Sequence, residues 1–140
     1  MRILLDTNVL VSGLLGREGH SGRLLQLWLD DAFELVSSRH QLSELRRVTG
    51  YTRIKGRIDS AEVADLLDLM LSKSLLVEIV QVPMVSADPD DNLILAAAIA
   101  GNANLIVSGD KGHMVVLGHV EDIPIVTPRE AFARLSANDS

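Results

Sequence analysis

The chain of 140 residues contains no cysteine, which excludes disulfide bonds and metal sites built on thiolates. It also lacks an apolar run long enough to cross a membrane, because Asp6 interrupts the hydrophobic opening segment "MRILLDTNVL". The same segment is too short for a signal peptide. We therefore expect no membrane association and a cytoplasmic location, with which the absence of cysteine is compatible.

Basic residues are in deficit, with 13 Lys and Arg against 19 Asp and Glu, and the net charge is −6. This balance argues against a protein that merely coats nucleic acid, although an enzyme whose acidic residues hold cations remains possible. Internal repeats, low-complexity runs and linkers are also absent. The length and the 47% content of hydrophobic residues predict one compact domain over residues 1–140.

Short apolar segments alternate with helical patterns along the chain. Five segments have the length and composition of strands, at residues 2–6, 33–37, 75–80, 104–108 and 123–127. Helices are expected at residues 21–31, 38–48 and 89–100, and others open at residues 59 and 128. The strands are continuously apolar, which is typical of a sheet buried on both faces. We therefore predict an α/β fold with a mostly parallel sheet of about five strands, covered by helices on both faces.

Several helix boundaries carry specific signals. Ser38 and Gln41 have the spacing of a capping box, and Gly50 is a stop signal for the helix that they open. Asp88 is a good N-cap residue in front of Pro89. We expect Gly101 to end that helix in the left-handed conformation.

Four acidic residues are predicted to meet at the carboxyl edge of the sheet. Asp6 ends the first strand, and Asp110 comes just after the fourth. Asp91 lies in the first turn of the helix that follows the third strand, and Glu44 lies beside the buried stripe of the helix after the second. Because sites in open parallel sheets form at this edge, the four side chains are candidates for one site.

Each acid alone also has a purely structural explanation. Asp6 and Asp110 suit turns, Glu44 suits an ion pair with a neighbouring arginine, and Asp88 and Asp91 suit helix capping, which contributes about 0.3–1 kcal/mol. Four acids in one place, however, repel one another unless cations neutralise them or some remain protonated. The simplest neutralising group is Mg²⁺ or Mn²⁺, because both ions prefer carboxylate and water oxygens.

Such an ion lowers the pKa of a bound water and neutralises charge on a phosphoryl oxygen, which suits hydrolysis of a phosphodiester. No covalent nucleophile is then needed. Four polar residues beside the acids are candidates to orient them or to bind the waters of the metal: Thr7, Asn8, Asn92 and Ser108. We assign no metal role to the histidines, which lack zinc-site spacing: His20, His40, His113 and His119.

The segment "RRVTGYTRIKGR" holds five cations and no acid. A solvated basic surface and a surface that follows RNA phosphates both explain it, and Tyr51 is available to stack on a base. The candidate RNA-binding residues are Arg46, Arg47, Tyr51, Arg53, Lys55 and Arg57.

Three segments of this chain resemble the PIN domain: "LLDTNVLVSGLL", "SELRRV" and "DPDDNLILAAAIAGNANLIVSGDK". The resemblance extends over essentially the whole chain. Within the family, the chain is most similar in character to the VapC-like toxins of bacterial toxin–antitoxin pairs. It implies a small α/β/α sandwich, a Mg²⁺- or Mn²⁺-dependent ribonuclease activity, a cognate antitoxin and a homodimer.

The acids of that family fall on Asp6, Glu44, Asp91 and Asp110, with Asn8 in the turn that follows the first. Asp88 is an additional acid, which is a helix cap or a contact to a metal-bound water. Asp90 is expected to face solvent.

Other functions fit the motifs less well. A phosphatase of the haloacid-dehalogenase type needs a second aspartate two residues after the first, where this chain has Asn8. A dinucleotide-binding domain needs a glycine-rich turn after the first strand, which "DTNVLVSG" does not provide. A non-catalytic module that binds RNA or a protein partner stays open.

Overall fold

The computed structural model describes residues 1–138, and the side chains of residues 52, 53 and 138 lie outside that description. Within this range the chain forms a sheet with the strand order β3-β2-β1-β4-β6-β5, in which all strands run parallel except β5, which is antiparallel to β6. The strands are β1 (Arg2–Leu5), β2 (Glu34–Ser37), β3 (Leu75–Leu76), β4 (Leu105–Val107), β5 (His119–Val120) and β6 (Ile123–Val126).

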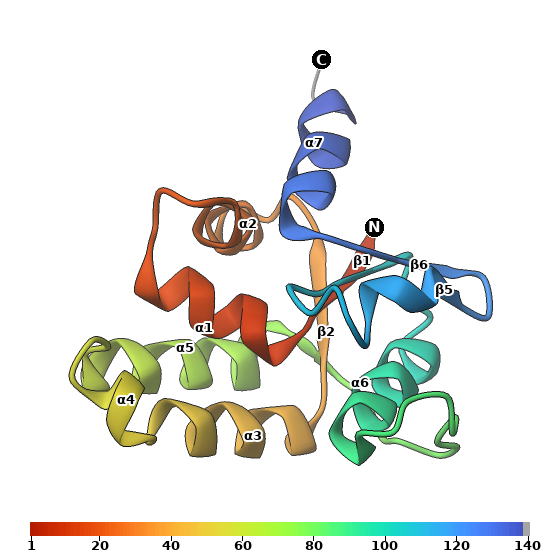
Figure 1. The fold of residues 1–140 in the computed structure, drawn as a ribbon. Helices are drawn as coiled ribbons and strands as arrows, with labels where there is room; N and C mark the ends of the chain where they lie inside the picture. Colours follow the sequence, from red (N-terminus) through yellow and green to blue (C-terminus); the bar gives the residue numbers. More distant parts are fainter. Residues whose placement is uncertain (139–140) are drawn as a thin grey trace.

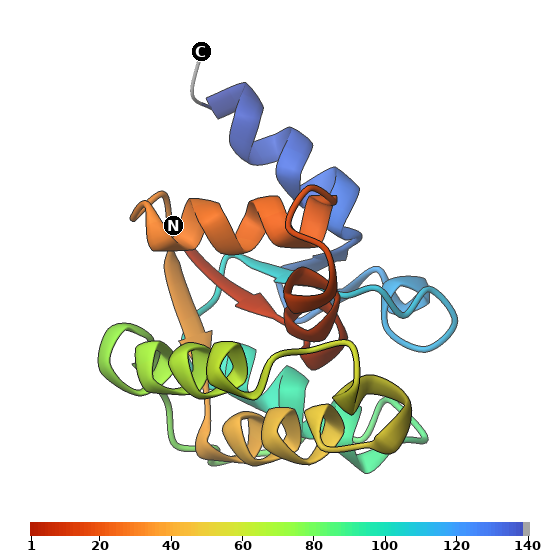
Figure 2. The same cartoon turned by 90° about the vertical axis from the view of Figure 1, so that its left-hand side faces the viewer.

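Helices cover the two faces of this sheet (Figures 1 and 2). They are α1 (Thr7–Leu15), α2 (His20–Leu29), α3 (Arg39–Thr49), α4 (Thr52–Lys55), α5 (Ser60–Lys73), α6 (Pro89–Ala100), the 3₁₀ helix η1 (Val115–Leu117) and α7 (Pro128–Asn138). None of the described helices is long and apolar enough to span a lipid bilayer.

The core is divided by the sheet because successive side chains of a strand point to opposite faces. Ile3 and Leu5 of β1 pack in a cluster with buried residues of α1, α2, α3 and α5. Leu4, between them, packs with Ile94 and Leu95 of α6. Figure 1 shows α6 on the opposite side of the sheet from α1, α2 and α5. The predicted sandwich with a mostly parallel sheet is therefore confirmed.

Strand β1 occupies the position at which the order of the strands reverses. It pairs with β2 on one side and with β4 on the other. When the chain leaves two adjacent parallel strands toward opposite sides, a crevice forms between the carboxyl ends of those strands. The fold therefore opens a crevice where Asp6 follows β1 and Ser108 follows β4.

Two local features differ from the sequence-based expectation at the start of the chain. A helix, α1, begins directly after Asp6, whose side chain accepts a hydrogen bond from the backbone amide of Thr7. The "DTN" segment therefore starts a helix rather than an isolated turn. The glutamine of the expected capping box also turns inward, because Nε2 of Gln41 donates to the carbonyl of Leu5 at 2.6 Å. Ser38 still caps α3 through the amide of Gln41.

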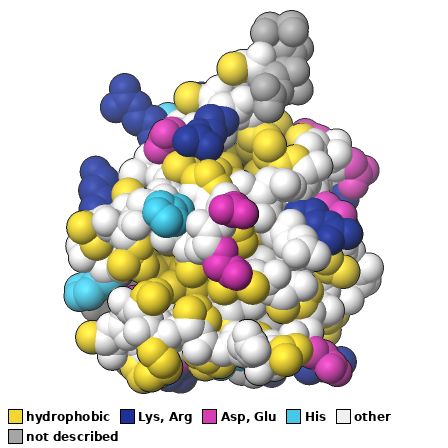
Figure 3. Space-filling view, turned by 90° about the vertical axis from the view of Figure 1, so that its right-hand side faces the viewer, with side chains coloured by type: hydrophobic (Ala, Val, Ile, Leu, Met, Phe, Trp, Pro, Cys, Tyr) yellow, Lys and Arg dark blue, Asp and Glu magenta, His cyan; other side chains and the backbone are white. Residues whose placement is uncertain are grey.

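The third strand is shorter than predicted. It pairs with β2 over Leu75 and Leu76 only, and residues 78–85 continue without a regular partner strand. Val80 and Met84 in this segment are 84% and 85% exposed. Figure 3 shows hydrophobic side chains on this side of the molecule. An apolar run at the edge of a sheet has no second neighbour to pair with, so hydrophobicity alone overestimates the length of the strand.

The turn after α6 also departs from the prediction. Gly101 has a φ of −89°, and the left-handed residue is Asn102 with a φ of 51°. Glycine is required at position 101 for space, because a Cβ atom there would lie 2.6 Å from Cγ1 of Val36. The two elements that were not predicted after β4 are η1 and β5, both short.

Gly101→Ala should therefore destabilise the protein by about 1–3 kcal/mol, because the new methyl group overpacks against a β-branched side chain that has little freedom to move. Gly56→Ala is the matched control, since no atom lies within 4 Å of a Cβ at that position. The control should be neutral or stabilising by up to about 1 kcal/mol. Urea denaturation measures both, and equal stability of the two variants would contradict the packing role of Gly101.

Candidate functional site

The crevice beside β1 forms a cleft of about 400 Å³. The four acids predicted to share a site all line it, together with two further acids; the acidic lining residues are Asp6, Glu44, Asp88, Asp90, Asp91 and Asp110. The remaining lining residues include apolar side chains of Val11, Leu15, Val48 and Ile54. A second cavity of about 280 Å³ between α2 and α5 is largely apolar and brings together no comparable set of acids.

Asp6 is the most buried of these acids, with 5% of its surface exposed. Its Oδ1 accepts a hydrogen bond from the amide of Thr7 at 2.8 Å. Its Oδ2 accepts from Oγ of Ser108 at 2.8 Å and from Nδ2 of Asn8 at 3.2 Å. The donors fix the direction of the carboxylate, so that its position is determined by both β1 and β4.

Glu44 reaches the cleft from the second turn of α3. The hydroxyl of Thr7 donates to Oε1 of Glu44, and the glutamate side chain is only 11% exposed. The inward-turned Gln41 helps to hold α3 in this place, since it binds the carbonyl of Leu5 and accepts from the hydroxyl of Ser37 at 2.6 Å. Sequence analysis identified Gln41 as a cap residue and missed this function.

Asp88 and Asp91 make different contacts in the structure. The carboxylate of Asp88 accepts from the amide of Asp90 at 2.9 Å and caps α6. Asp91 accepts from Oγ of Ser86 at 3.0 Å. Asn92 is buried and binds the backbone of Ser86 through both its oxygen and its nitrogen, at 2.9 Å each. Asn92 thus acts on Asp91 through Ser86, a residue that the sequence analysis did not identify.

Asp110 completes the cleft from the loop after β4. Its amide donates to Oγ of Ser108 at 3.1 Å, so one hydroxyl links Asp110 to Asp6. Its Oδ1 accepts from the amides of Gly112 and His113 at 3.1 and 2.9 Å. Of the five residues expected to assist the acids, Thr7, Asn8 and Ser108 donate to them directly, Asp88 caps α6, and Asn92 acts indirectly.

The cleft is electrostatically unfavourable for negative charge. Burial raises the pKa of Asp6 to about 6, with further increases from the charges of Asp91 and Glu44. Burial also raises the pKa of Glu44, and it raises that of Asp91 together with the neighbouring charges of Asp88 and Asp110. Among the described residues that line the cleft, none is a lysine or arginine. The site therefore favours protons or added cations.

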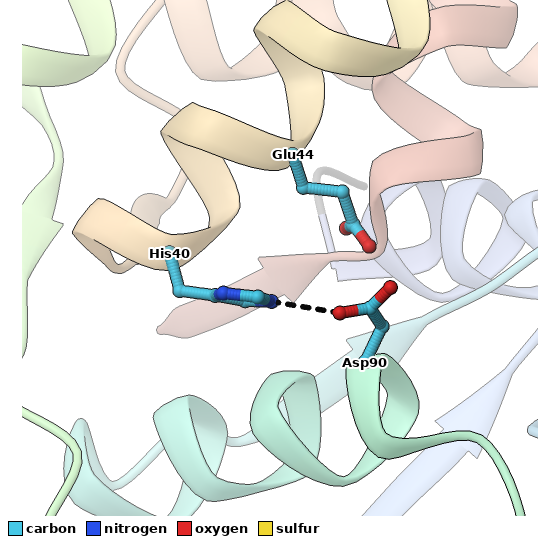
Figure 4. Close-up of side chains that lie close together, drawn as sticks. All are labelled: His40, Glu44 and Asp90. Carbon is cyan, nitrogen blue, oxygen red and sulfur yellow. Dashed lines mark ion pairs between the residues drawn. The ribbon is translucent and has the colours of Figure 1, made fainter.

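Asp90 is partly exposed, with 38% of its side chain accessible to solvent, and its carboxylate also contacts side chains of α3. Its Oδ1 lies 3.2 Å from Nε2 of His40, and its Oδ2 lies 3.4 Å from Nη2 of Arg47 (Figure 4). Arg47 also reaches Oε2 of Glu44 at 3.8 Å. These contacts were not predicted, because helix periodicity gives the direction of a side chain but not the neighbouring element, which here is α3. The sequence does indicate that His40 and Glu44 lie on the same face of α3, because they are four residues apart.

The basic segment lies at one end of the cleft. Arg46, Arg47, Lys55 and Arg57 are exposed, and Tyr51 is 43% exposed. Ile54, within the segment, lines the cleft itself. The side chain of Arg53 lies outside the described part of the structure. The contribution of this segment to RNA binding stays a prediction.

A family model for the PIN domain matches residues 2–112. The chain belongs to the PIN domain family. The matched range includes all four acids at the cleft, from Asp6 to Asp110. No curated protein sequence matches this PIN domain.

Among solved structures, this PIN domain is similar to a chain of VapBC2 from Rickettsia felis, which was solved bound to a DNA fragment from its promoter. The two chains are 17% identical and superpose with a TM-score of 0.55. The similarity covers 91% of this chain and 98% of the other. At this identity the likeness establishes the fold.

The raised pKa of Asp6 predicts a pH-dependent stability of the metal-free PIN domain. A native carboxyl with a pKa of about 6, against an ordinary value of 3.8, binds its proton more tightly than in the unfolded chain. Stability is therefore highest below pH 4 for this group and falls as pH rises to about 7. Relative to Asp6→Asn, the free energy of unfolding should fall by about 3 kcal/mol across that range. A difference between the two proteins that stays constant with pH would contradict this.

Proposed function

We propose that this PIN domain is a metal-dependent ribonuclease, in which Asp6, Glu44, Asp91 and Asp110 hold Mg²⁺ or Mn²⁺ for hydrolysis of RNA phosphodiester bonds. The observation that carries the proposal is the convergence of these four acids in one cleft without a lysine or arginine among its described lining residues. Membership of the PIN family supports it, because PIN domains are generally nucleases that use a divalent metal.

The side chains fit a hard divalent ion. All four acids offer oxygen atoms, which Mg²⁺ and Mn²⁺ prefer, and the pKa values of Asp6, Glu44 and Asp91 are raised in the metal-free protein. Burial is the largest cause of these raised values, so the protein on its own favours the neutral forms of these acids. A bound cation would favour the ionised forms of these acids, which already line one cleft.

When bound, the ion supplies a water of lowered pKa and neutralises charge on a phosphoryl oxygen. The chain's own residues provide the geometry. Thr7, Asn8 and Ser108 hold Asp6 in one orientation, and Thr7 also binds Glu44. The amino-terminal ends of α1 and α6 both lie at the cleft, where their partial positive charge favours an anionic phosphate.

RNA would extend from the cleft toward the basic segment. Arg46, Lys55 and Arg57 present exposed positive charge there, while Val48 and Ile54 give the adjoining part of the cleft an apolar wall. Phosphate contacts of this kind position a strand without reading its sequence. Tyr51 offers a face on which one base can stack.

We further propose that this PIN domain acts in the cytoplasm as the toxin component of a toxin–antitoxin pair, with a cognate antitoxin as its protein partner. The support is the similarity of its fold to VapBC2 from Rickettsia felis. A homodimer is proposed on the same family grounds.

The central test is cleavage of an unstructured RNA by Asp91→Asn. Loss of this acid should reduce Mg²⁺- or Mn²⁺-dependent cleavage by about a hundredfold or more, because even residues that only orient a metal ligand contribute tenfold to a hundredfold. EDTA should abolish cleavage by the parent protein. Asp68→Asn removes the same charge from an exposed position on α5 and should leave cleavage unchanged.

The same variants distinguish an effect on metal binding from an effect on the stability of the fold. An ion that binds only the folded parent protein stabilises it by about 2.7 kcal/mol at a hundredfold excess over its dissociation constant. Asp91→Asn should shrink that stabilisation while leaving the melting temperature of the metal-free protein equal or higher.

If Asp88→Asn is inactive in RNA cleavage and Asp91→Asn is active, the assignments of helix cap and metal ligand are reversed. If neither matters and Mn²⁺ does not stabilise the protein, a non-catalytic binding module replaces the nuclease.

The basic segment is tested by the salt dependence of RNA binding. Exchange of Lys55 and Arg57 for glutamine should weaken binding and reduce the slope of log K against log salt by about 0.7 for each phosphate contact that is lost. Arg2→Gln with Lys73→Gln removes two charges near the opposite edge of the sheet and is the matched control. An unchanged slope in the first double variant would mean that the segment is only a solvated surface.

A further inference from the structure

We infer that His40, Glu44 and Asp90 form a second cation subsite at the rim of the cleft, which binds a divalent transition-metal ion of the Zn²⁺ class in preference to Mg²⁺. The inference deepens the proposed nuclease site, and its test reads metal binding separately from cleavage. Figure 4 shows the three side chains converging from α3 and from the first turn of α6.

The positions of the donor atoms carry the inference. One ligand atom from each of His40, Glu44 and Asp90 lies within 4.8 Å of the other two. Metal bonds of 2.0–2.2 Å to nitrogen and oxygen place neighbouring donors about 3–3.5 Å apart. Nε2 of His40 and Oδ1 of Asp90 are already 3.2 Å apart. Glu44 offers the third donor of the set.

Among the residues that the structure describes, no hydrogen-bond partner explains the placement of the His40 nitrogen. Nε2 is shielded from solvent and forms no hydrogen bond of ordinary geometry within that part of the chain. Its contact with Asp90 is an ion pair only when the imidazole is protonated. A buried ring nitrogen that points between two carboxylates is an arrangement that a metal ion satisfies directly.

The two oxygens of Glu44 serve different sides of the cleft. Oε1 accepts from the hydroxyl of Thr7, on the side of Asp6, whereas Oε2 faces Arg47 on the side of Asp90. One carboxylate can therefore contribute an oxygen to each subsite. The rim differs in chemistry from the interior, because imidazole nitrogen suits Zn²⁺ and related ions while a set of oxygens alone suits Mg²⁺.

Arg47 already provides positive charge at the rim. Its guanidinium lies 3.4 Å from Asp90 and 3.8 Å from Glu44, and the hydrogen bond to Asp90 raises its pKa above the ordinary value. A metal ion at the rim competes with this charge. Removal of the charge by Arg47→Gln should therefore increase the affinity for Zn²⁺.

His40→Gln is the decisive variant, because glutamine keeps a donor that can reach Asp90 but does not replace imidazole as a metal ligand. Calorimetric titration of the metal-free protein should show at least a tenfold loss of Zn²⁺ affinity and less than a twofold change in Mg²⁺ affinity. His113→Gln is the matched control, since His113 lies 3.4 Å from Asp110 but outside the rim set. It should leave both affinities unchanged.

A measurement on the parent protein tests the subsite without depending on whether the variants fold. Addition of Zn²⁺ should shift the ring signals of His40 in the NMR spectrum, while the same concentration of Mg²⁺ should not. Asp90→Asn should weaken Zn²⁺ binding as His40→Gln does. Unchanged Zn²⁺ affinity in His40→Gln, or loss of affinity in His113→Gln instead, overturns the subsite.

Failure of the subsite and failure of the nuclease are distinguishable. If Asp91→Asn loses Mg²⁺-dependent cleavage while His40→Gln binds Zn²⁺ normally, the rim holds only an ion pair that joins α3 to α6, and the nuclease stands. If His40→Gln loses Zn²⁺ binding while Asp91→Asn cleaves RNA normally, the subsite stands without the proposed nuclease.

Discussion

The buried carboxylate of Asp6 joins the parts of the fold on which the cleft depends. The amide of Asp6 donates to the carbonyl of Val107 at 2.8 Å, which continues the pairing of β1 with β4 beyond the last strand residue. Its side chain caps α1 and accepts the hydroxyl of Ser108. One residue thereby fixes the end of the central strand, the start of the first helix and the loop that carries Asp110. Loss of this carboxylate removes a structural link as well as a charge.

The same arrangement concentrates charge in a place where water cannot screen it fully. Burial is the largest cause of the raised pKa of Asp6, Glu44 and Asp91, and the neighbouring acids add to it. Hydrogen bonds from Ser108, Thr7 and Ser86 act in the opposite direction. The cluster is thus a local departure from stability in a core that is otherwise apolar, and such departures occur where a function requires them.

Side chains at the rim extend this chemistry beyond the four acids of the cleft. Asp90 joins α6 to α3 through His40 and Arg47, and Glu44 faces both the interior and the rim. The interior therefore offers oxygen donors alone, whereas the rim adds an imidazole and a guanidinium.

Much of the secondary structure follows from the sequence because its signals are local. The continuous apolar runs identify β1, β2, β4 and β6, and Ser38 and Asp88 cap α3 and α6 in the expected way. The four acids were located from their places at strand ends and early helix positions. The helix α1 was missed because "DTN" suits a turn as well as a helix cap, and β3 was overestimated because pairing at a sheet edge depends on a neighbour.

The sequence by itself determined the class of fold, the family and the identity of the acids, since these depend on periodicity, capping and the order of motifs. Only the tertiary structure decided that Gln41 holds α3 against β1 and that Asn92 acts through Ser86. It also decided that Asp90, although partly exposed, lies beside His40. These contacts join residues on different elements, or on a helix and the loop before it, and no periodic pattern within one segment specifies which surfaces meet when the chain is folded.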